Sequence, residues 1–203
     1  MQILRNILTA VLCLLTLQTI SGATTARNVL DKAAKAVSNA GGVSARFTLT
    51  GQKLGNMSGT ISVKGSKFHA STPNVLIWFD GKTQWTYMKN TEEVNVSNPT
   101  PAQAQSLNPY NFITMYRTGF TYTMESKADS YVVHLKATDT KRSVKEMYIT
   151  VSKSDYTPRQ VRMLQAGGWT TVTISNLQKK SLSDSFFRFN PKSYPQAELI
   201  DLR

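Results

Sequence analysis

Two histidines are the side chains of this sequence best suited to acid–base or metal chemistry near neutral pH. His69 and His134 each stand alone on an expected strand, without a cysteine or a paired carboxylate at ligand spacing. The adjacent Glu92 and Glu93 would point to opposite faces of a strand, which is poor geometry for an acid–base pair. No nucleophile elbow and no glycine-rich phosphate loop is present. The sequence therefore predicts no catalytic residue, no metal site and no cofactor.

Flexible and aromatic apolar side chains are the residues that stand out instead. Methionines recur from Met57 to Met163, and tryptophans stand at Trp78, Trp85 and Trp169. Thioether side chains adapt their shape to a neighbour, which suits a surface that receives flexible acyl chains. The same residues could equally fill an ordinary core, so a binding pocket and a solid interior both remain open.

The N-terminal residues 1–23 have the build of a secretory signal peptide. Arg5 is their only charge, an apolar stretch follows it, and Ser21-Gly22-Ala23 supplies small residues for cleavage. The segment is too short and too interrupted by polar residues to span a membrane comfortably. We therefore expect export to the periplasm and a single domain over residues 24–203. Cleavage would remove Cys13, the only cysteine, so the mature domain would have no disulfide.

The composition is strongly basic, because 24 Lys and Arg against 12 Asp and Glu give a net charge of +12. Such an excess favours anionic partners, which include membrane headgroups, acidic protein patches and nucleic acid. Export argues against nucleic acid. The basic residues are also dispersed along the sequence rather than packed into one stripe, which equally fits a solubilising surface.

Residues 75–96 carry the clearest structural pattern. Five large apolar residues, Val75–Phe79, run into an Asp80-Gly81 turn, and a strand then returns through Trp85 and Tyr87. A strand of alternating apolar and polar residues buries one face, whereas the Val75–Phe79 run needs apolar neighbours on both of its faces. This pattern predicts a meander in a sheet that curls around something apolar.

The rest of the chain is expected to hold one helix, a helical insert and further strands. Residues 24–40 place their apolar side chains on one helical face. Alternation then predicts strands, with a break in which two short helices are expected over residues 102–107 and 108–119. A final strand is expected at Phe186–Pro191, followed by a loose apolar end.

These elements predict a mainly β (α+β) fold. About ten or eleven antiparallel strands would form one curled sheet, because a sheet of that length does not lie flat. The expected result is an incomplete β-barrel. The N-terminal helix and the mid-chain insert both have apolar faces. We expect them to bury these faces against the concave side of the sheet, as a lid.

Three motifs carry a resemblance to a known family. Phe79–Tyr87 is similar to a DGKxxWxY hairpin, Gly59–Lys64 to a GxxxxK strand, and Phe187–Pro191 to an FxFxPP ending. In this order they resemble the periplasmic outer-membrane lipoprotein carriers (LolA-like) of the LolA/LolB superfamily, across essentially the whole mature chain. One departure is clear. The family has Arg-Pro, thought to latch the lid, after its GxxxxK strand; the corresponding stretch of this chain, Lys64–His69, has none, so the latch is not carried over.

The resemblance implies a monomeric carrier that binds lipoprotein acyl chains in an apolar cavity under a helical lid and delivers them to the outer membrane. The implied partners are those acyl chains, an inner-membrane lipoprotein-releasing ABC transporter, and an outer-membrane acceptor or membrane surface. No catalysis is required. The candidate cavity and lid residues are Val29, Leu30, Val37, Phe47, Leu49, Ile61, Val63, Leu76, Trp78, Trp85, Tyr87, Phe112, Ile113, Met115 and Tyr116.

Three alternatives remain open at this level. A binding module of the same fold could sense or receive lipid without shuttling it. An exported enzyme on a curled β scaffold would need a polar cleft that converges on His69 or His134. A structural envelope protein would have a solid core and no pocket.

Overall fold

The computed structural model describes residues 24–38, 41–51, 55–100 and 115–203. Within them, one helix, α2 (Ala26–Val37), precedes a single twelve-stranded sheet. The strands are β1 (Val43–Gly51), β2 (Gly55–Lys64), β3 (Lys67–Ser71), β4 (Val75–Phe79), β5 (Gln84–Met88), β6 (Glu93–Ser97), β7 (Phe120–Ser126), β8 (Ser130–Ala137), β9 (Glu146–Ser152), β10 (Pro158–Gln165), β11 (Gly168–Lys179) and β12 (Glu198–Asp201). Three 3₁₀ turns complete the description: η1 (Met115–Arg117), η2 (Asp184–Phe187) and η3 (Pro191–Ser193).

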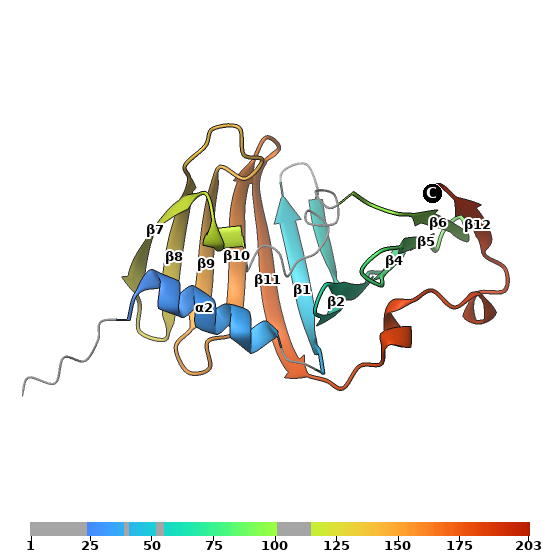
Figure 1. Cartoon of the computed structure of the whole chain (residues 1–203), viewed down its shortest axis with the longest axis horizontal. Helices are drawn as coiled ribbons and strands as arrows, with labels where there is room; N and C mark the ends of the chain where they lie inside the picture. The colour runs from blue at the N-terminus through green and yellow to red at the C-terminus, as the bar shows by residue number, and fades with distance from the viewer. Residues whose placement is uncertain (1–23, 39–40, 52–54, 101–114) are drawn as a thin grey trace, which may run out of the picture.

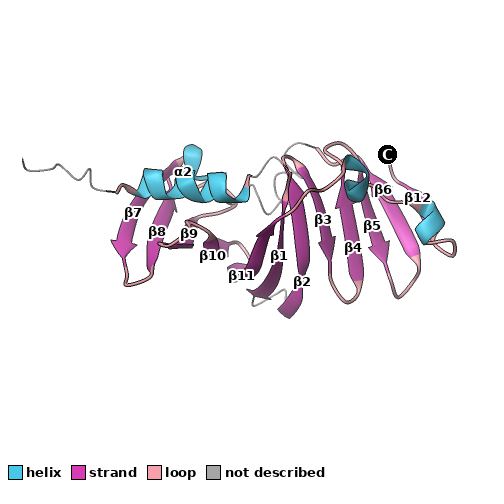
Figure 2. Ribbon diagram, turned by 90° about the horizontal axis from the view of Figure 1, so that it is seen from below, coloured by secondary structure: helices cyan, strands magenta, loops and turns pink. Residues whose placement is uncertain are grey.

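The sheet is open, with the strand order β12-β6-β5-β4-β3-β2-β1-β11-β10-β9-β8-β7. Neighbouring strands are antiparallel except β12, which pairs in parallel with β6. Figures 1 and 2 show the two edge strands, β7 and β12, at opposite ends of the molecule. The prediction of a mainly β fold with an incomplete barrel is therefore confirmed, with twelve strands in place of about ten or eleven.

Helix α2 is shorter than the predicted residues 24–40, since it runs from Ala26 to Val37. The Thr25 side chain caps it by accepting a hydrogen bond from the Asn28 backbone N–H at 3.2 Å. The predicted signal peptide and the first part of the predicted helical insert, residues 101–114, lie outside the described residues. No helix in the described part of the chain is long and apolar enough to cross a membrane.

The Asp80-Gly81 turn forms between β4 and β5 as predicted. Gly81 adopts a φ of 101°, a left-handed conformation that glycine tolerates without strain. The Asp80 carboxylate accepts the backbone N–H groups of Lys82 and Thr83 at 3.0 and 2.9 Å. These bonds fix the hairpin whose two strands form the centre of the predicted meander.

The prediction of a final strand at Phe186–Pro191 is wrong. The chain instead forms η2, crosses the sheet in an extended conformation, and forms η3 before it pairs as β12. The alternation that suggested a strand has another cause, because Phe187 and Phe189 are both buried, and Phe189 packs with Trp78. Asp184 anchors the start of this segment through ion pairs to Lys64 and Lys67, at 3.1 and 2.7 Å.

Helix α2 lies on one face of the sheet, which we call the inner face; the opposite face is the outer face. On the inner face, Met147 and Ile149 of β9 are fully buried and pack with Val29 and Leu30 of α2. Figure 1 shows α2 lying across β8 to β10, and Figure 2 shows the same helix along one side of these strands. The outer face is the one that points away from α2, because side chains alternate along each strand.

Two further clusters complete the core. The inner face continues into β2, β3 and β4, where Val37 packs with Phe68 and Phe79. The third cluster lies on the outer face and contains Trp78 of β4 together with Phe189 from the segment after β11. The sheet is thus covered by α2 on one face and by the C-terminal segment on the other, over different strands.

Candidate functional site

The inner face carries half-buried apolar side chains in the middle of the sheet. The register places Phe47 of β1 opposite Ile174 of β11, and Leu49 opposite Met57 of β2. Phe47, Leu49 and Ile174 are half-buried, and Met57 is 43% exposed. Single apolar groups in contact with water are common, whereas neighbouring ones that form a continuous row mark a candidate binding surface.

A glycine in β2 makes room for the Phe47 ring. Gly59 is the cross-strand partner of Phe47, and a Cβ atom at Gly59 would lie only 3.0 Å from that ring. The same Cβ atom would also collide with the Ser71 carbonyl oxygen. The ring of Phe47 therefore lies over the β2 backbone, as aromatic side chains commonly do beside a strand glycine.

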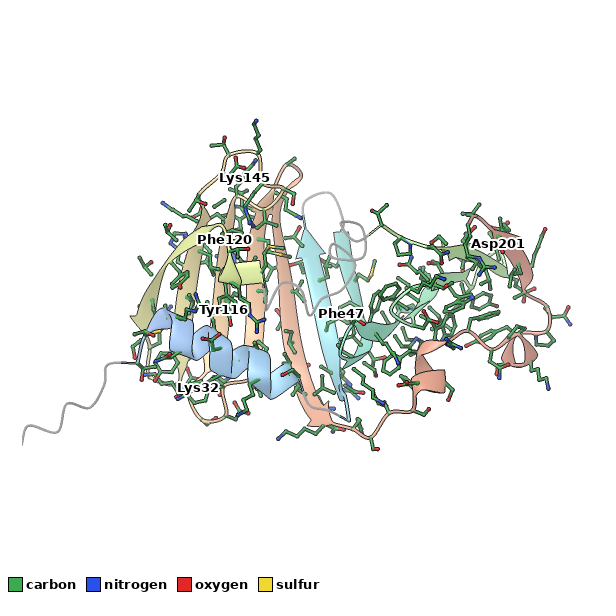
Figure 3. The ribbon with its side chains drawn as sticks, viewed as in Figure 1. Lys32, Phe47, Tyr116, Phe120, Lys145 and Asp201 are labelled. Atoms are coloured by element: carbon green, nitrogen blue, oxygen red, sulfur yellow. The ribbon has the colours of Figure 1, made fainter. Side chains whose placement is uncertain are left out.

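The apolar surface extends toward β4. Ile61 of β2 and Ile77 of β4 lie on the same face, through their shared partner Ala70 in β3. Both isoleucines are half-buried and pack against the cluster that contains Val37. We call the whole row the apolar strip; it consists of Phe47, Leu49, Met57, Ile61, Ile77 and Ile174. Figure 3 shows Phe47 on β1, to the side of the C-terminal end of α2.

The remaining predicted residues on the inner side are deeply buried. Val29 and Leu30 are fully covered, and Val37 and Val63 are 5% and 7% exposed. Tyr116 is buried in the first cluster, and Met115 packs against that cluster with a partly exposed side chain. These residues hold α2 on the sheet. Phe112 and Ile113 lie outside the described residues.

Four predicted cavity residues lie on the outer face. Leu76 pairs with Tyr87, and Trp78 pairs with Trp85, so all four share one side. Because Ile77 of the same strand faces the cluster under α2, its neighbours in sequence must face away from it. The sequence-based set is therefore divided between two faces. We place the candidate lipid-binding surface on the inner face, without these four residues.

The C-terminal segment covers the four outer-face residues. The Trp78 ring centroid lies 5.5 Å from that of Phe189 and 5.6 Å from that of Tyr194, and Tyr87 lies 4.9 Å from Tyr194. Edge-to-face and tilted contacts at these distances are favourable aromatic geometry. The signal that could have revealed this packing is the aromatic spacing of the FxFxPP-like motif, which fits a segment that lies on a face as well as a strand.

His69 belongs to the same outer-face packing. Its ring stacks on Trp78 with a centroid distance of 5.0 Å and meets the Phe186 ring edge-on at 5.3 Å. Its Nδ1 lies 2.9 Å from the Ile77 carbonyl oxygen, to which a neutral imidazole donates a hydrogen bond. Burial lowers the pKa of His69 below the usual value, because the charged form loses its hydration.

A side-chain bond that the sequence did not reveal joins α2 to η1. The Tyr116 hydroxyl donates to the Asp31 carboxylate, and Arg27 Nε lies 3.7 Å from the same carboxylate. Burial raises the pKa of Tyr116, and the bond to Asp31 raises it further. The partners are far apart in sequence, so no local pattern pointed to the pair. This contact fixes η1 on the helix.

The polar groups form no converging site with the apolar strip. His134 Nε2 lies 2.5 Å from Glu146 Oε1, across two strands on the outer face, which is the opposite side of the sheet. Over the residues that the structure covers, no group of three or more His, Cys, Asp or Glu side chains is arranged to hold a metal ion. The chemistry that the inner face supports is therefore apolar contact.

Comparisons with known proteins also indicate a lipid-binding family and its fold. Residues 17–167 match the family model of the outer membrane lipoprotein carrier protein LolA. No curated protein matches the chain. Among solved structures, the chain is similar to an uncharacterized conserved protein from Thermus thermophilus, at 12% identity with a TM-score of 0.58, over 87% of this chain and 98% of that chain.

Two further solved structures are similar at lower scores. One is a LolA superfamily protein from Nitrosomonas europaea, at 12% identity and a TM-score of 0.45, over 82% of this chain and 99% of that chain. The other is a putative outer membrane lipoprotein-sorting protein domain from Vibrio parahaemolyticus, at 15% identity and a TM-score of 0.44, over 78% and 94%. At identities this low, structural similarity concerns the fold alone.

Proposed function

We propose, from the premise that this chain belongs to the outer membrane lipoprotein carrier (LolA) family, that it binds the acyl chains of lipoproteins on its apolar strip. The family fold is one of binding and carrier proteins rather than of enzymes, and it indicates lipid or lipoprotein binding. The observation that carries the proposal is the row of half-buried apolar side chains from Ile174 to Ile77, beside the end of α2.

The energetics of such a surface suit a carrier. Each methylene that leaves water contributes about 0.8 kcal/mol, so about ten methylenes supply about 8 kcal/mol before the loss of motion is counted. The strip adjoins a helix whose own apolar face already occupies part of the inner face. A lipid that must share this face with α2 gains less than it would on an empty sheet. This competition favours handover without ATP.

We propose that the protein works in the periplasm after removal of residues 1–23 as a signal peptide. Its family supports an exported location. The proposed route starts at an inner-membrane lipoprotein-releasing ABC transporter and ends at an outer-membrane acceptor or at the membrane surface. The protein would act as a monomer.

A second candidate is a module that senses or receives lipid without shuttling it. The absence of the family Arg-Pro from the corresponding stretch, Lys64–His69, keeps this alternative open. The two functions separate in a cell depleted of its own carrier. Restored lipoprotein localisation supports the shuttle, whereas lipid binding without restored localisation supports the sensing module.

The binding surface itself is tested by a matched pair of substitutions. Phe47→Asp places a carboxylate in the apolar strip, and Thr48→Asp places one on the exposed outer face of the same strand. We expect Phe47→Asp to weaken binding of a fluorescent acyl lipid about tenfold or more, and Thr48→Asp to leave it unchanged. Circular dichroism checks that both variants are folded. Equal binding by two folded variants would contradict the proposed surface.

A further inference from the structure

The outer face of β8 to β11 carries a row of planar side chains that lipid binding does not use. We call it the aromatic row; it consists of His134, Tyr148, Arg162 and Trp169. Tyr148 is the cross-strand partner of both His134 and Arg162, and Trp169 comes from the adjacent strand β11. The residues next to them in sequence, such as Met147 and Met163, are buried under α2, so the row faces away from the helix.

The rings of the row are packed against one another. The His134 and Tyr148 rings are stacked, with centroids 4.2 Å apart and an interplanar angle of 3°. The Tyr148 and Trp169 centroids are 5.9 Å apart, and the Arg162 guanidinium lies 5.0 Å from the Trp169 ring and 5.9 Å from the Tyr148 ring. Side chains held in this way lose little conformational entropy when a partner binds. Trp, Tyr and Arg are also the residue types that dominate binding energy at protein interfaces.

Arg162 is the group of the row that could bind an anionic partner. It is exposed, and among the described residues its contacts are with the two rings, without an ion pair or a hydrogen bond. The guanidinium offers five N–H donors in a planar fork that matches a carboxylate. The contacts with Trp169 and Tyr148 hold the guanidinium over the two rings and so restrict its motion before any partner arrives.

The charges around the row favour an anionic partner. Lys136 of β8 and Arg46 of β1 are exposed on the same outer face and form no ion pair within the described residues. The nearby carboxylate of Glu146 already accepts hydrogen bonds, from Tyr148 at 3.2 Å and through the short contact with His134. Glu146 keeps its negative charge, but Arg162, Lys136 and Arg46 outnumber it around the row, in a chain of net charge +12.

We propose that the aromatic row is a docking surface for an acidic segment of a partner protein. A carboxylate of that segment would bind the Arg162 fork, and its apolar side chains would pack on the exposed edges of Trp169 and Tyr148. The surface lies on the opposite side of the sheet from the apolar strip. Lipid and partner could therefore be bound at the same time, and neither site depends on the other.

The test uses the full mature chain and a short capped, fluorescent peptide in which glutamate and leucine alternate. Arg162→Glu should weaken its binding about tenfold or more at low ionic strength, because the fork is replaced by a like charge. Trp169→Ala should weaken it several-fold. Lys35→Glu is the matched control, since it makes the same charge change on an exposed position of α2, behind the sheet; it should have little effect. Circular dichroism verifies that each variant is folded.

Two comparisons make the outcome decisive. A peptide in which lysine and leucine alternate should not bind, and vesicles that contain phosphatidylglycerol should bind equally to Arg162→Glu and to the unaltered protein. Equal losses in Arg162→Glu and Lys35→Glu would overturn the proposal, because net charge alone would then explain binding. It would also be overturned if the acidic peptide did not bind, or if Arg162→Glu reduced binding to vesicles and not to the peptide. If Trp169→Ala does not fold, Arg162→Glu alone decides the test, because Arg162 is exposed and its substitution should not disturb the fold.

Discussion

The absence of one Cβ atom decides where the most prominent ring of the candidate site lies. Gly59 has no Cβ, so the Phe47 ring can lie over the neighbouring strand. The sequence motifs predict a strand at Gly59–Lys64, and Phe47 is among the candidate cavity residues. The sequence could not identify the role of Gly59, since that role depends on which strand pairs with β1 and in which register.

Gly59→Ala tests this packing. The added methyl group would meet the Phe47 ring and the Ser71 carbonyl oxygen, so the strand must shift or the ring must move. We expect a loss of about 1–3 kcal/mol in the free energy of unfolding, as in other overpacked sites, and weaker binding of acyl lipid. Urea unfolding and a lipid-binding titration measure the two effects. The control is Gly55→Ala. A Cβ atom at Gly55 would meet no atom within 4 Å, so this substitution adds only the backbone strain of a φ of 66° and no steric contact. Unchanged lipid binding in a folded Gly59→Ala variant would contradict the role given to Phe47.

His69 supplies the second prediction at this scale, a dependence of stability on pH. Burial keeps its native pKa below the value of about 6.5 that the unfolded chain has. Between these two values the unfolded state binds more protons, so the contribution of His69 is complete above about pH 6.5 and is lost as the pH falls further. The loss has a slope of at most about 1.4 kcal/mol per pH unit. It should be absent in His69→Gln. Denaturant unfolding of both proteins from pH 7.5 downward, at about half-unit steps, gives the difference; parallel stability curves would rule out this role for His69.

At the scale of elements, local patterns predicted what depends on neighbours in sequence. The amphipathic helix, the Asp80-Gly81 hairpin and most strands follow from period and turn chemistry. The C-terminal segment was predicted incorrectly, because Phe189 is buried against a face of the sheet that is assembled by distant strands. Strand alternation alone places Trp78 and Ile77 on opposite faces. Which of these faces lies under α2 could not be predicted, because both sides of β4 are covered by segments remote in sequence.

Phe187→Ala tests whether the C-terminal segment is an integral part of the fold. Its side chain is fully buried, so truncation should destabilise the protein by about 3–5 kcal/mol if the segment unfolds together with the sheet. The adjacent Phe186→Ala is the matched control; that ring is 39% exposed, and its loss should have a clearly smaller effect. Thermal unfolding followed by tryptophan fluorescence reports on both variants, since Trp78 contacts the same segment. Similar, small losses in the two variants would show that the segment detaches independently.

At the scale of the whole molecule, the fold is one open sheet with a cover on each face, over different strands. The class of the sheet was predictable, because its strand count and alternation leave few arrangements. The strands that lie under α2 were not predictable. They depend on the pairing of β1 with β11, which are far apart in the sequence. The charge of the molecule, in contrast, is fully given by its composition. The sequence holds twice as many basic residues as acidic ones, so the compact state must contain considerable repulsion.

This repulsion leads to a prediction for the whole protein. Raising sodium chloride from about 20 to about 200 mM shortens the Debye length from about 20 Å to below 10 Å, so repulsion between distant surface charges is screened. We expect the melting temperature to rise by about 2–4 °C, which corresponds to about 1 kcal/mol for a domain of this size. The double variant Lys179→Glu/Lys180→Glu reverses two exposed charges at the end of β11. It should be more stable than the unaltered protein at low salt and should respond less to added salt. A melting temperature that falls with salt would mean that attractive ion pairs, such as those of Asp184 with Lys64 and Lys67, outweigh the excess of positive charge.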